Sequence, residues 1–411
     1  MEDNNDTANA YLLASMLFPN SGLTCLLICA AMESDQTPEE QRNQRRRERW
    51  MAYTPHERRM RARCVPRIGT LPPLQSPWQM LYSSKDNQSF LTATGVKRES
   101  FMALLKDFSP LFWAHSPYST EIDNGRIRTM EKTERRGRAR KMSAHACLGM
   151  VLFWTRTTCY NWTIATYFGI VASSCSLWLR HGRRILLAVL RKTKEAEICM
   201  PDEEKLQQYK QAISDKYPAL KHVSYVADGL KILIQRAGDF RKQNKFYNGW
   251  KSDHYITNLF LFGPDGTINA CVLNCPGSMH DSELAMMGMP SIYSKIDEWH
   301  DKFGAQCVMD SAFCGSSRNS IIKSIPRERV WSESCDPEEA LVLDQALSVR
   351  QAAEWGMRAL QGSMPRLKTR WVYEEKDERM ISLTLICLIY NYRANTTDLN
   401  QIRNVFMNPS S

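Results

Sequence analysis

The pattern of apolar residues changes at residue 222, and this change constrains the fold more than any other feature of the chain. Before it, apolar residues recur at helical spacing, as over residues 97–118. After it, short apolar runs rich in β-branched and aromatic residues are separated by turn signals such as Gly263-Pro264-Asp265-Gly266. We therefore expect an all-α region followed by an α/β region.

The order of the expected elements predicts three parts. Residues 1–90 read as a basic, flexible N-terminal extension, residues 91–221 as a helical, helix-turn-helix-like DNA-binding region, and residues 222–411 as an α/β domain. Within the last part we expect three strands in a meander, then a helix, a strand and a helix. That order is ribonuclease H-like and indicates a layered α/β fold.

The charge is divided unevenly between the two halves. The chain has 411 residues, with 54 Lys and Arg against 44 Asp and Glu, a net charge of +10. Residues 1–221 hold 33 basic and 22 acidic side chains, whereas residues 222–411 hold 21 and 22. The hydrophobic content of 43% excludes a wholly disordered chain. A basic first half predicts contact with a polyanion.

Three helical segments in the basic half have the outline of a helix-turn-helix. We expect helices near residues 143–155, 162–168 and 172–191, with Gly169 in the turn before the last one. Basic side chains on the last helix are predicted to contact DNA phosphates: Arg180, Arg183 and Arg184. An ordinary three-helix bundle remains the alternative.

Two Arg-rich stretches also favour contact with nucleic acid. Residues 41–67 hold ten Arg and two Glu, and residues 126–141 hold eight Lys or Arg and two Glu. The uncharged segment 7–32 is preceded by acidic residues and interrupted by Pro19-Asn20-Ser21-Gly22, which argues against a membrane span. We expect a loose extension or a small helical hairpin there, with a signal peptide as the lesser alternative. The 13 cysteines form no CxxC pair, which is typical of reduced intracellular thiols.

Two short strands are expected to end in an aspartate, Asp228 and Asp310. If the two strands are parallel neighbours, the carboxylates lie close together and repel each other unless a cation lies between them. Oxygen ligands of this kind suit Mg²⁺ or Mn²⁺. Glu354 is our candidate for a third carboxylate, although an ion pair with Arg350 or Arg358 one helical turn away is the simpler interpretation of this residue.

The motifs of the second half, taken together, resemble the DDE superfamily transposases of the PIF/Harbinger type. The matching pieces, in chain order, are Ala227-Asp228-Gly229, Phe246-Tyr247-Asn248-Gly249-Trp250-Lys251, Gly263-Pro264-Asp265-Gly266, Pro276-Gly277-Ser278-Met279-His280-Asp281-Ser282, Met309-Asp310-Ser311-Ala312-Phe313, Ser348-Val349-Arg350 before Glu354, and Asn400-Gln401-Ile402. The resemblance runs from about residue 222 to 406, and the helical region at 98–191 resembles the helix-turn-helix part that precedes this nuclease domain in the family.

The resemblance implies a site and a chemistry. Asp228, Asp310 and Glu354 would be the catalytic triad that binds two Mg²⁺ or Mn²⁺ ions for DNA cleavage and strand transfer. His280 and Asp281 would be active-site neighbours. Further basic residues are expected to contact DNA: Lys251, Arg350 and Arg358.

The same resemblance implies the partners and the compartment. DNA with transposon terminal repeats would be the substrate, a separate Myb-like protein would help to bind it, and the nucleus would be the location. Assembly into a homo-oligomer is left open, and no membrane association is expected.

The chain departs from the family pattern around the expected site. Leu230 follows Asp-Gly where a hydroxyl residue is usual, and Ala312-Phe313 replaces Gly-Tyr after the second Asp. Trp355 and Gln361 stand where Arg and Lys are usual. The three carboxylates remain, which favours a metal-dependent nuclease or transposase. The alternative is a domesticated, transposase-derived DNA-binding protein that does not cleave.

Overall fold

The computed structural model describes most of the chain from residue 71 onward. It describes residues 71–117, 122–123, 126–127, 140, 142–236, 238–313, 318–325, 330, 336–372, 375–397 and 399–407. The elements described below belong to one compact unit, from which only Met286–Met289 among the described residues are grouped apart. The uncharged segment, the Arg-rich segment 41–67 and nearly all of the basic stretch 126–141 lie outside the described residues.

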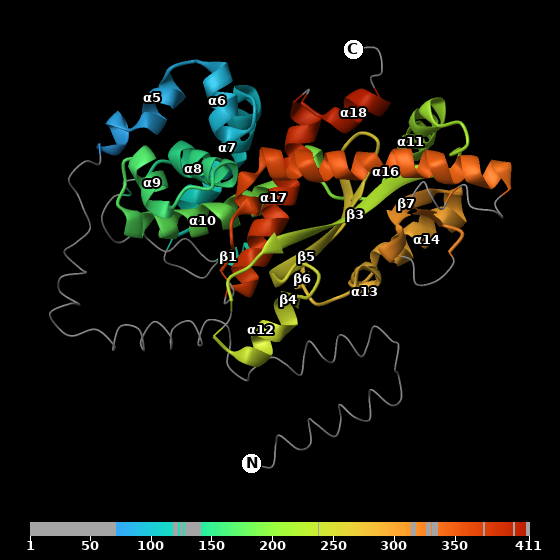
Figure 1. The fold of residues 1–411 in the computed structure, drawn as a ribbon. Coiled ribbons are helices and arrows are strands. Elements are labelled where there is room, and N and C mark those ends of the chain that lie inside the picture. The colour runs from blue at the N-terminus through green and yellow to red at the C-terminus, as the bar shows by residue number, and fades with distance from the viewer. Residues whose placement is uncertain are drawn as a thin grey trace. The chain divides into compact units, whose positions relative to one another are not determined.

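Helices make up most of the described part of the chain before residue 217 (Figure 1). They are α5 (Pro77–Ser83), α6 (Asn87–Thr94), α7 (Arg98–Ala114), α8 (Ala144–Arg156), α9 (Asn161–Tyr167), α10 (Ala172–Leu190) and α11 (Glu203–Lys216). Polar side chains cap several N-termini, as where Asp86 accepts hydrogen bonds from the N–H groups of Gln88 and Ser89. Helix α10 packs against α7, α8 and α9. These bounds confirm the helices that apolar spacing predicts.

The structure differs from the sequence-based expectation for residues 77–90, the end of the predicted flexible extension. Trp78 on α5 is only 1% exposed. Its ring lies 5.2 Å from that of Phe168 and 5.9 Å from that of Phe101, between ring centroids. A Cβ at Gly149 would lie 2.1 Å from the Trp78 ring, so glycine makes room for the indole. The burial of this large aromatic surface orders a segment whose local sequence reads as a linker.

Helices α9 and α10 meet at an angle of 89° across a break of four residues. Gly169 turns the chain there with a φ of +66°, a conformation that glycine adopts without strain. The last six residues of α10, 185–190, are all buried, so its surface face lies in its first two-thirds. No single described helix is long and apolar enough to cross a membrane, and the α9–α10 pair reaches that length only when its two bent helices are added together.

The second half of the chain forms a six-stranded mixed sheet (Figure 1). Its strands are β3 (Val223–Leu233), β4 (Tyr247–Asn248), β5 (Asp253–Phe262), β6 (Ile268–Pro276), β7 (Gln306–Asp310) and β8 (Ile321–Ser324). The order is β4-β5-β3-β7-β8, with β6 also paired to β5. Strands β3, β5 and β6 form an antiparallel meander, whereas β3, β7 and β8 are parallel. A separate pair, β1 (Ile122–Asp123) and β2 (Arg126–Ile127), is antiparallel.

The sheet differs from the expected strands in three places. The two short strands expected at 223–227 and 232–235 are one continuous strand, because β5 pairs with β3 along its whole length from Val226 to Leu233. The Asp-Gly signal therefore lies inside a strand rather than in a turn. Residues 237–251, which read as a polar loop, contain α12 (Phe240–Phe246) and β4, and the sequence did not predict β8.

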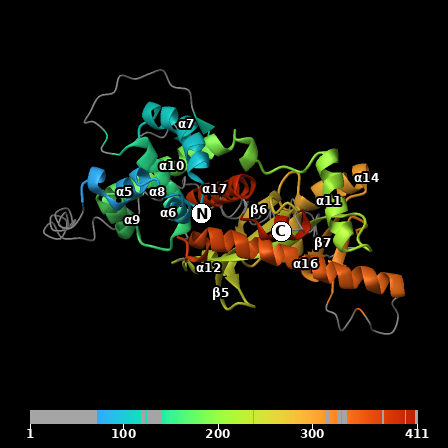
Figure 2. The same ribbon diagram turned by 90° about the horizontal axis from the view of Figure 1, so that it is seen from above.

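Two long helices join this sheet to the rest of the fold. The remaining helices are α13 (Asp281–Met286), α14 (Ile292–Phe303), α16 (Pro337–Ser363), α17 (Lys376–Thr396) and α18 (Gln401–Phe406). Helix α16 contacts β3, β7 and β8, and Figures 1 and 2 both show it running across the strands. Helix α17 contacts β6 on one side and α10 on another, so it connects the sheet to the N-terminal helices.

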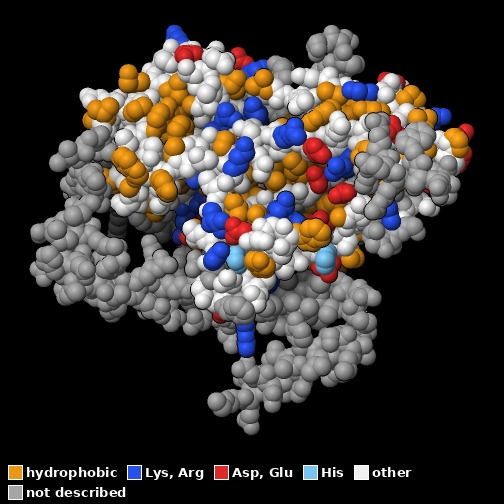
Figure 3. All heavy atoms as spheres, viewed as in Figure 1, with side chains coloured by type: hydrophobic (Ala, Val, Ile, Leu, Met, Phe, Trp, Pro, Cys, Tyr) orange, Lys and Arg blue, Asp and Glu red, His pale blue; other side chains and the backbone are white. Residues whose placement is uncertain are grey.

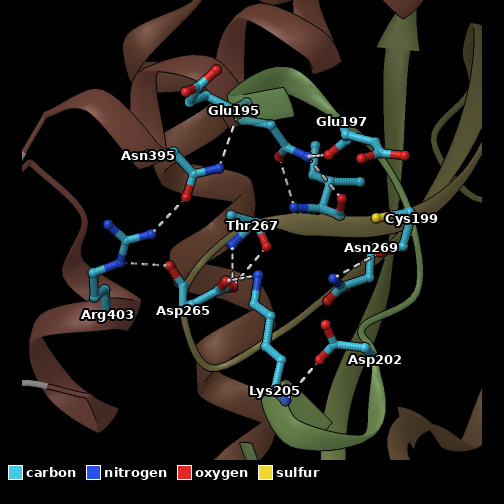
Figure 4. Close-up of polar contacts among 12 residues, drawn as sticks. Glu195, Glu197, Cys199, Asp202, Lys205, Asp265, Thr267, Asn269, Asn395 and Arg403 are labelled. Carbon is cyan, nitrogen blue, oxygen red and sulfur yellow. Dashed lines mark hydrogen bonds and ion pairs between the residues drawn. The ribbon is translucent and has the colours of Figure 1, made fainter. Parts of the chain in front are cut away.

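The hairpin turn between β5 and β6 is tied to two helices through Asp265 (Figure 4). This carboxylate is 5% exposed and lies 2.8 Å from the Lys205 ammonium of α11. It also accepts hydrogen bonds from the backbone and the hydroxyl of Thr267. Asn400 and Arg403 donate to the Asp265 carbonyl from α18 and its N-cap. Asp265 therefore joins three elements of the fold and lies apart from the acids of the candidate site.

Candidate active site

Asp228 and Asp310 lie side by side on parallel strands. The register of β3 and β7 pairs Ala227 with Met309, so the next residue of each strand is one of the two aspartates. Neighbouring strands are about 4.8 Å apart, which brings the two residues together. The expectation that these strands are parallel neighbours is confirmed. Strand β7 ends at Asp310, whereas β3 continues beyond Asp228. The pairing of β3 with β7 therefore stops at the two aspartates.

The surroundings of Asp228 disfavour its charged form. Its pKa is raised to about 6, chiefly because burial disfavours the charged form, with the negative charges of Asp310 and Glu354 acting in the same direction. The N–H of Gly229, 2.7 Å from Asp228 Oδ1, and the positive charge of Arg350 lower the pKa. The three acids predicted from the sequence therefore influence one another, and a cation among them would stabilise the charged state.

Glu354 is supplied by α16, which crosses the sheet over β3 and β7. Arg350 Nη2 lies 3.2 Å from Glu354 Oε1, and Arg358 Nη2 lies 4.0 Å from Glu354 Oε2. The ion pair that the sequence left as the simpler interpretation is thus present. Glu354 also acts on Asp228 through its charge, so the structure is compatible with both interpretations. Figure 3 shows acidic side chains gathered near the middle of α16 among Lys and Arg.

The donor chemistry of these acids fits a divalent cation, but their placement does not yet form a complete ligand set. Within the described ranges, no three His, Cys, Asp or Glu side chains are gathered closely enough to hold a metal ion. Asp228 and Asp310 supply hard carboxylate oxygens from adjacent strands, as Mg²⁺ and Mn²⁺ prefer. Glu354 is engaged with Arg350. Metal binding by all three acids therefore requires Glu354 to exchange its arginine partner for the metal.

Asp281 lies beside this pair of strands. A Cβ built on Gly229 would be 3.8 Å from Asp281 Oδ1 and 3.4 Å from the Phe313 ring, so Asp281 faces the residue next to Asp228. Asp281 is the first residue of α13. The preceding His280 is exposed, and its backbone N–H donates to Glu283 Oε2 at 3.3 Å. Of the two neighbours predicted from the sequence, Asp281 lies close to Gly229, on the face of β3 opposite to the Asp228 side chain, because successive side chains of a strand alternate between faces.

The three arginines of α10 that were predicted to contact DNA converge on one carboxylate of α17. Arg180, Arg183 and Arg184 lie 2.9, 3.3 and 2.5 Å from the oxygens of Glu378. The side chains of Arg183 and Arg184 are 15% and 13% exposed, whereas that of Arg180 is 43% exposed. Arg183 and Arg184 therefore pair with a carboxylate of the protein itself, whereas the sequence predicted that they contact DNA phosphates. DNA contact by Arg180, with its larger exposed fraction, stays a prediction.

Two residues have structural roles that the sequence did not predict, although Asn248 lies inside one of the motifs quoted above. Glu378 has no sequence signal beyond its position in a charged run, because its partners are almost 200 residues away. Asn248 belongs to an Asn-Gly pair, which is a turn signal. Its side chain donates to the carbonyl of Gly277 at 2.9 Å and accepts from the N–H of Lys251 at 3.1 Å. Lys251 itself is exposed.

Comparison with known families bears directly on this site. Residues 227–391 match the family model of DDE superfamily endonucleases. The match begins one residue before Asp228 and ends within α17, so it spans Asp228, Asp310 and Glu354. Comparison with curated proteins and with solved structures gives no match.

The family match covers the sheet and α16, where the acidic residues lie. It suggests nuclease activity of a transposase-like kind and implies DNA as the substrate. Endonucleases of this superfamily generally use divalent metals, which agrees with the chemistry of the carboxylates. The mixed α/β architecture is consistent with such a nuclease domain.

Proposed function

We propose that this protein is a metal-dependent DNA endonuclease of the Harbinger transposase type. Asp228, Asp310 and Glu354 are its metal-binding catalytic residues, and DNA cleavage, followed by strand transfer, is its reaction. The observation that carries the proposal is the parallel register that sets Asp228 beside Asp310 inside the segment that matches the endonuclease family.

The chemistry follows from the charges at the site. Bound divalent ions, two in the scheme that we favour, supply activation of water or of a DNA 3′-hydroxyl for in-line attack on phosphorus. The chain supplies the negative charge that holds such ions, from two strands that cannot move apart because they share a ladder of hydrogen bonds. Arg350 and Arg358 supply positive charge on the DNA-facing side of α16.

The finer assignments rest on sequence motifs and local geometry. The antiparallel meander β3-β5-β6, followed by α14 and the parallel strand β7, supports a ribonuclease H-like core. The 89° angle between α9 and α10 supports a helix-turn-helix-like DNA-binding region. Transposon terminal repeats as the substrate, a Myb-like partner protein and a nuclear location belong to the same proposal.

A nicking assay tests the catalytic assignment. Purified protein with Mn²⁺ is incubated with supercoiled plasmid that carries candidate terminal repeats, and nicked circles are measured on a gel. We expect Asp310→Asn to abolish nicking, because it removes one charge from the adjacent pair. Asp301→Asn, an exposed carboxylate on α14, is the matched control and is expected to nick like the wild type.

Equal nicking by the wild type and by Asp310→Asn would refute the catalytic role of this site. DNA binding without nicking, by a protein that is folded and loaded with Mn²⁺, would favour a domesticated binding protein instead. Joining of a labelled 3′-OH oligonucleotide to the plasmid separates strand transfer from simple hydrolysis.

A further inference from the structure

Trp250 projects from the turn between β4 and β5 with 97% of its surface exposed. Among the large hydrophobic side chains that the structure describes as exposed, it has the largest exposed fraction. An indole offers about 150–250 Å² of surface for burial, and leaving it in water forgoes that stabilisation. The position of this side chain is therefore unexplained by the folding of the chain itself.

The turn that presents Trp250 is held by hydrogen bonds on both sides. Strand β4 pairs with β5 through Asn248 and Asp253. The Asn248 side chain, 8% exposed, bonds the carbonyl of Gly277 and the N–H of Lys251. A turn fixed in this way loses little conformational entropy on binding, so the indole is pre-organised for contact with a partner.

The surroundings of Trp250 are strongly basic. Residues 231–251 contain six Lys or Arg and one Asp. Arg236, Arg241 and Lys251 are exposed, and Figure 3 shows Lys and Arg side chains on the surface near α12. The nearest acid in the following strand, Asp253, is neutralised by Arg370, whose Nη1 and Nη2 lie 3.1 and 2.6 Å from its oxygens. The indole and the nearby Tyr247, which is 43% exposed, offer only a small aromatic surface among cations. This lacks the broad apolar patch that protein partners use, and it suits nucleic acid.

The same turn is connected to the acidic site. Asn248 is bonded to Gly277, and three residues separate Gly277 from Asp281, whose Oδ1 lies near Gly229. Four Cα–Cα steps span at most about 15 Å, which is roughly four base steps of DNA. The turn that carries Trp250 is thus linked, through one hydrogen bond and a short chain segment, to the neighbourhood of the strand that carries Asp228.

We propose that Trp250 stacks on an unpaired base of the DNA a few nucleotides from the scissile phosphate, with Lys251 and Arg241 on the neighbouring phosphates. This inference rests on the proposed function and adds a substrate preference to it: DNA that is locally unpaired beside the cleavage position binds better than continuous duplex. Stacking on an aromatic ring is available only to a base that has left the helix.

Fluorescence anisotropy in EDTA, where binding is measured without cleavage, tests this preference. Two labelled duplexes are compared, one fully paired and one with a short central bubble. We expect the wild type to prefer the bubble at least about fivefold, and Trp250→Ala to lose that preference while it keeps its affinity for the paired duplex. Trp250→Phe is expected to keep most of the preference. Leu74→Ala, which alters another exposed apolar side chain, is the control.

The outcomes separate this inference from the proposed function. If the wild type binds and nicks DNA but Trp250→Ala keeps the full bubble preference, the role of Trp250 is wrong and the nuclease assignment stands. If the wild type neither binds nor nicks DNA, both are wrong. If Trp250→Ala instead converts a dimer into a monomer in light scattering, the indole belongs to a protein interface and the stacking role is overturned.

Discussion

Arg350 donates a hydrogen bond to Glu354 from one turn earlier on α16, with 3.2 Å between Nη2 and Oε1. The same guanidinium lowers the pKa of Asp228, which burial, Asp310 and Glu354 raise. One arginine therefore supplies counter-charge to two of the three acids. A divalent cation that binds these acids competes with Arg350 for Glu354.

This competition predicts that Arg350→Ala strengthens metal binding. Loss of a partly exposed ion pair one turn apart costs the metal-free protein only about 0.3–0.5 kcal/mol. The rise in melting temperature on adding Mn²⁺ is expected to be larger in the variant, since Glu354 no longer has to leave a partner. A tenfold gain in affinity adds about 1.4 kcal/mol of stabilisation at saturating metal.

Differential scanning fluorimetry across a Mn²⁺ titration measures this effect. Arg358→Ala is the matched control, because Arg358 is 4.0 Å from Glu354 and its side chain is 79% exposed. Its metal response is expected to resemble that of the wild type. A weaker response to Mn²⁺ in Arg350→Ala would show that Arg350 supports metal binding rather than opposing it.

The raised pKa of Asp228 predicts a specific pH dependence of stability. The folded value is about 6, whereas an unfolded Asp titrates near about 3.9. Between these values the folded state binds a proton that the unfolded state does not, so this group adds stability as the pH falls from 7 towards 4. Above pH 6 its charged form costs stability. Asp228→Asn is therefore expected to stabilise the metal-free protein at pH 7 by about 1–3 kcal/mol.

Urea unfolding in EDTA at pH 5 and pH 7 measures this difference. Because other carboxylates titrate in the same range, the informative quantity is the free energy of unfolding of Asp228→Asn relative to the wild type. We expect the advantage of the variant to shrink as the pH falls. An advantage that is absent at pH 7, or equal at both pH values, would contradict the raised pKa.

The fold was predictable from the sequence where local pattern and tertiary packing agree. Helices α7, α8 and α10 lie within a few residues of their expected bounds, because apolar spacing records the face that each one buries. The Asp228-Gly229 pair was misread because its local preference is for a turn, and only the partner strand β5 keeps it extended. Trp78 was missed because its buried environment comes from residues far along the chain.

Part of the candidate site could likewise be predicted from the sequence, and part could not. The adjacency of Asp228 and Asp310 followed from strand order, since parallel neighbours share an edge. The partner of Glu354 was foreseen only as an alternative, because spacing along a helix shows which pairs are within reach and not which pair forms. The convergence of Arg183 and Arg184 on Glu378 depends on how α10 meets α17, which no local pattern records.

That convergence predicts separate roles for the arginines of α10. Glu378→Gln leaves buried guanidinium groups without their counter-charge and is expected to cost about 2–4 kcal/mol in the free energy of unfolding. Arg184→Ala is expected to destabilise the protein with little change in the salt dependence of DNA binding. Arg180→Ala is expected to do the reverse, because the side chain of Arg180 is 43% exposed.

Urea unfolding and binding titrations at several salt concentrations separate these effects. Asp377→Asn alters an exposed carboxylate next to Glu378 and serves as the control for a change of charge on α17. If Arg184→Ala left stability unchanged and reduced the salt slope, the original prediction of a phosphate contact would hold for that residue.

Asp265 predicts a loss of stability that is independent of catalysis. Burial raises the pKa of this carboxyl, but the charge of Lys205 and hydrogen bonds from Lys205 and Thr267 outweigh burial, so the net pKa is lowered. A lowered folded pKa means that the group stabilises the fold at neutral pH and that this contribution is lost as the pH falls through the folded value. Asp265→Asn is therefore expected to cost about 2–3 kcal/mol at pH 7.

Urea unfolding at pH 7 and at pH 3.5, combined with the nicking assay at low temperature, tests this assignment. The deficit of Asp265→Asn relative to the wild type is expected to narrow at the lower pH, because the unfolded wild type takes up a proton there that the folded carboxylate, with its lowered pKa, does not. Nicking by the folded variant is expected to be near normal, in contrast to Asp310→Asn. A stable Asp265→Asn protein that no longer nicks DNA would show that Asp265 takes part in cleavage rather than in holding the fold together.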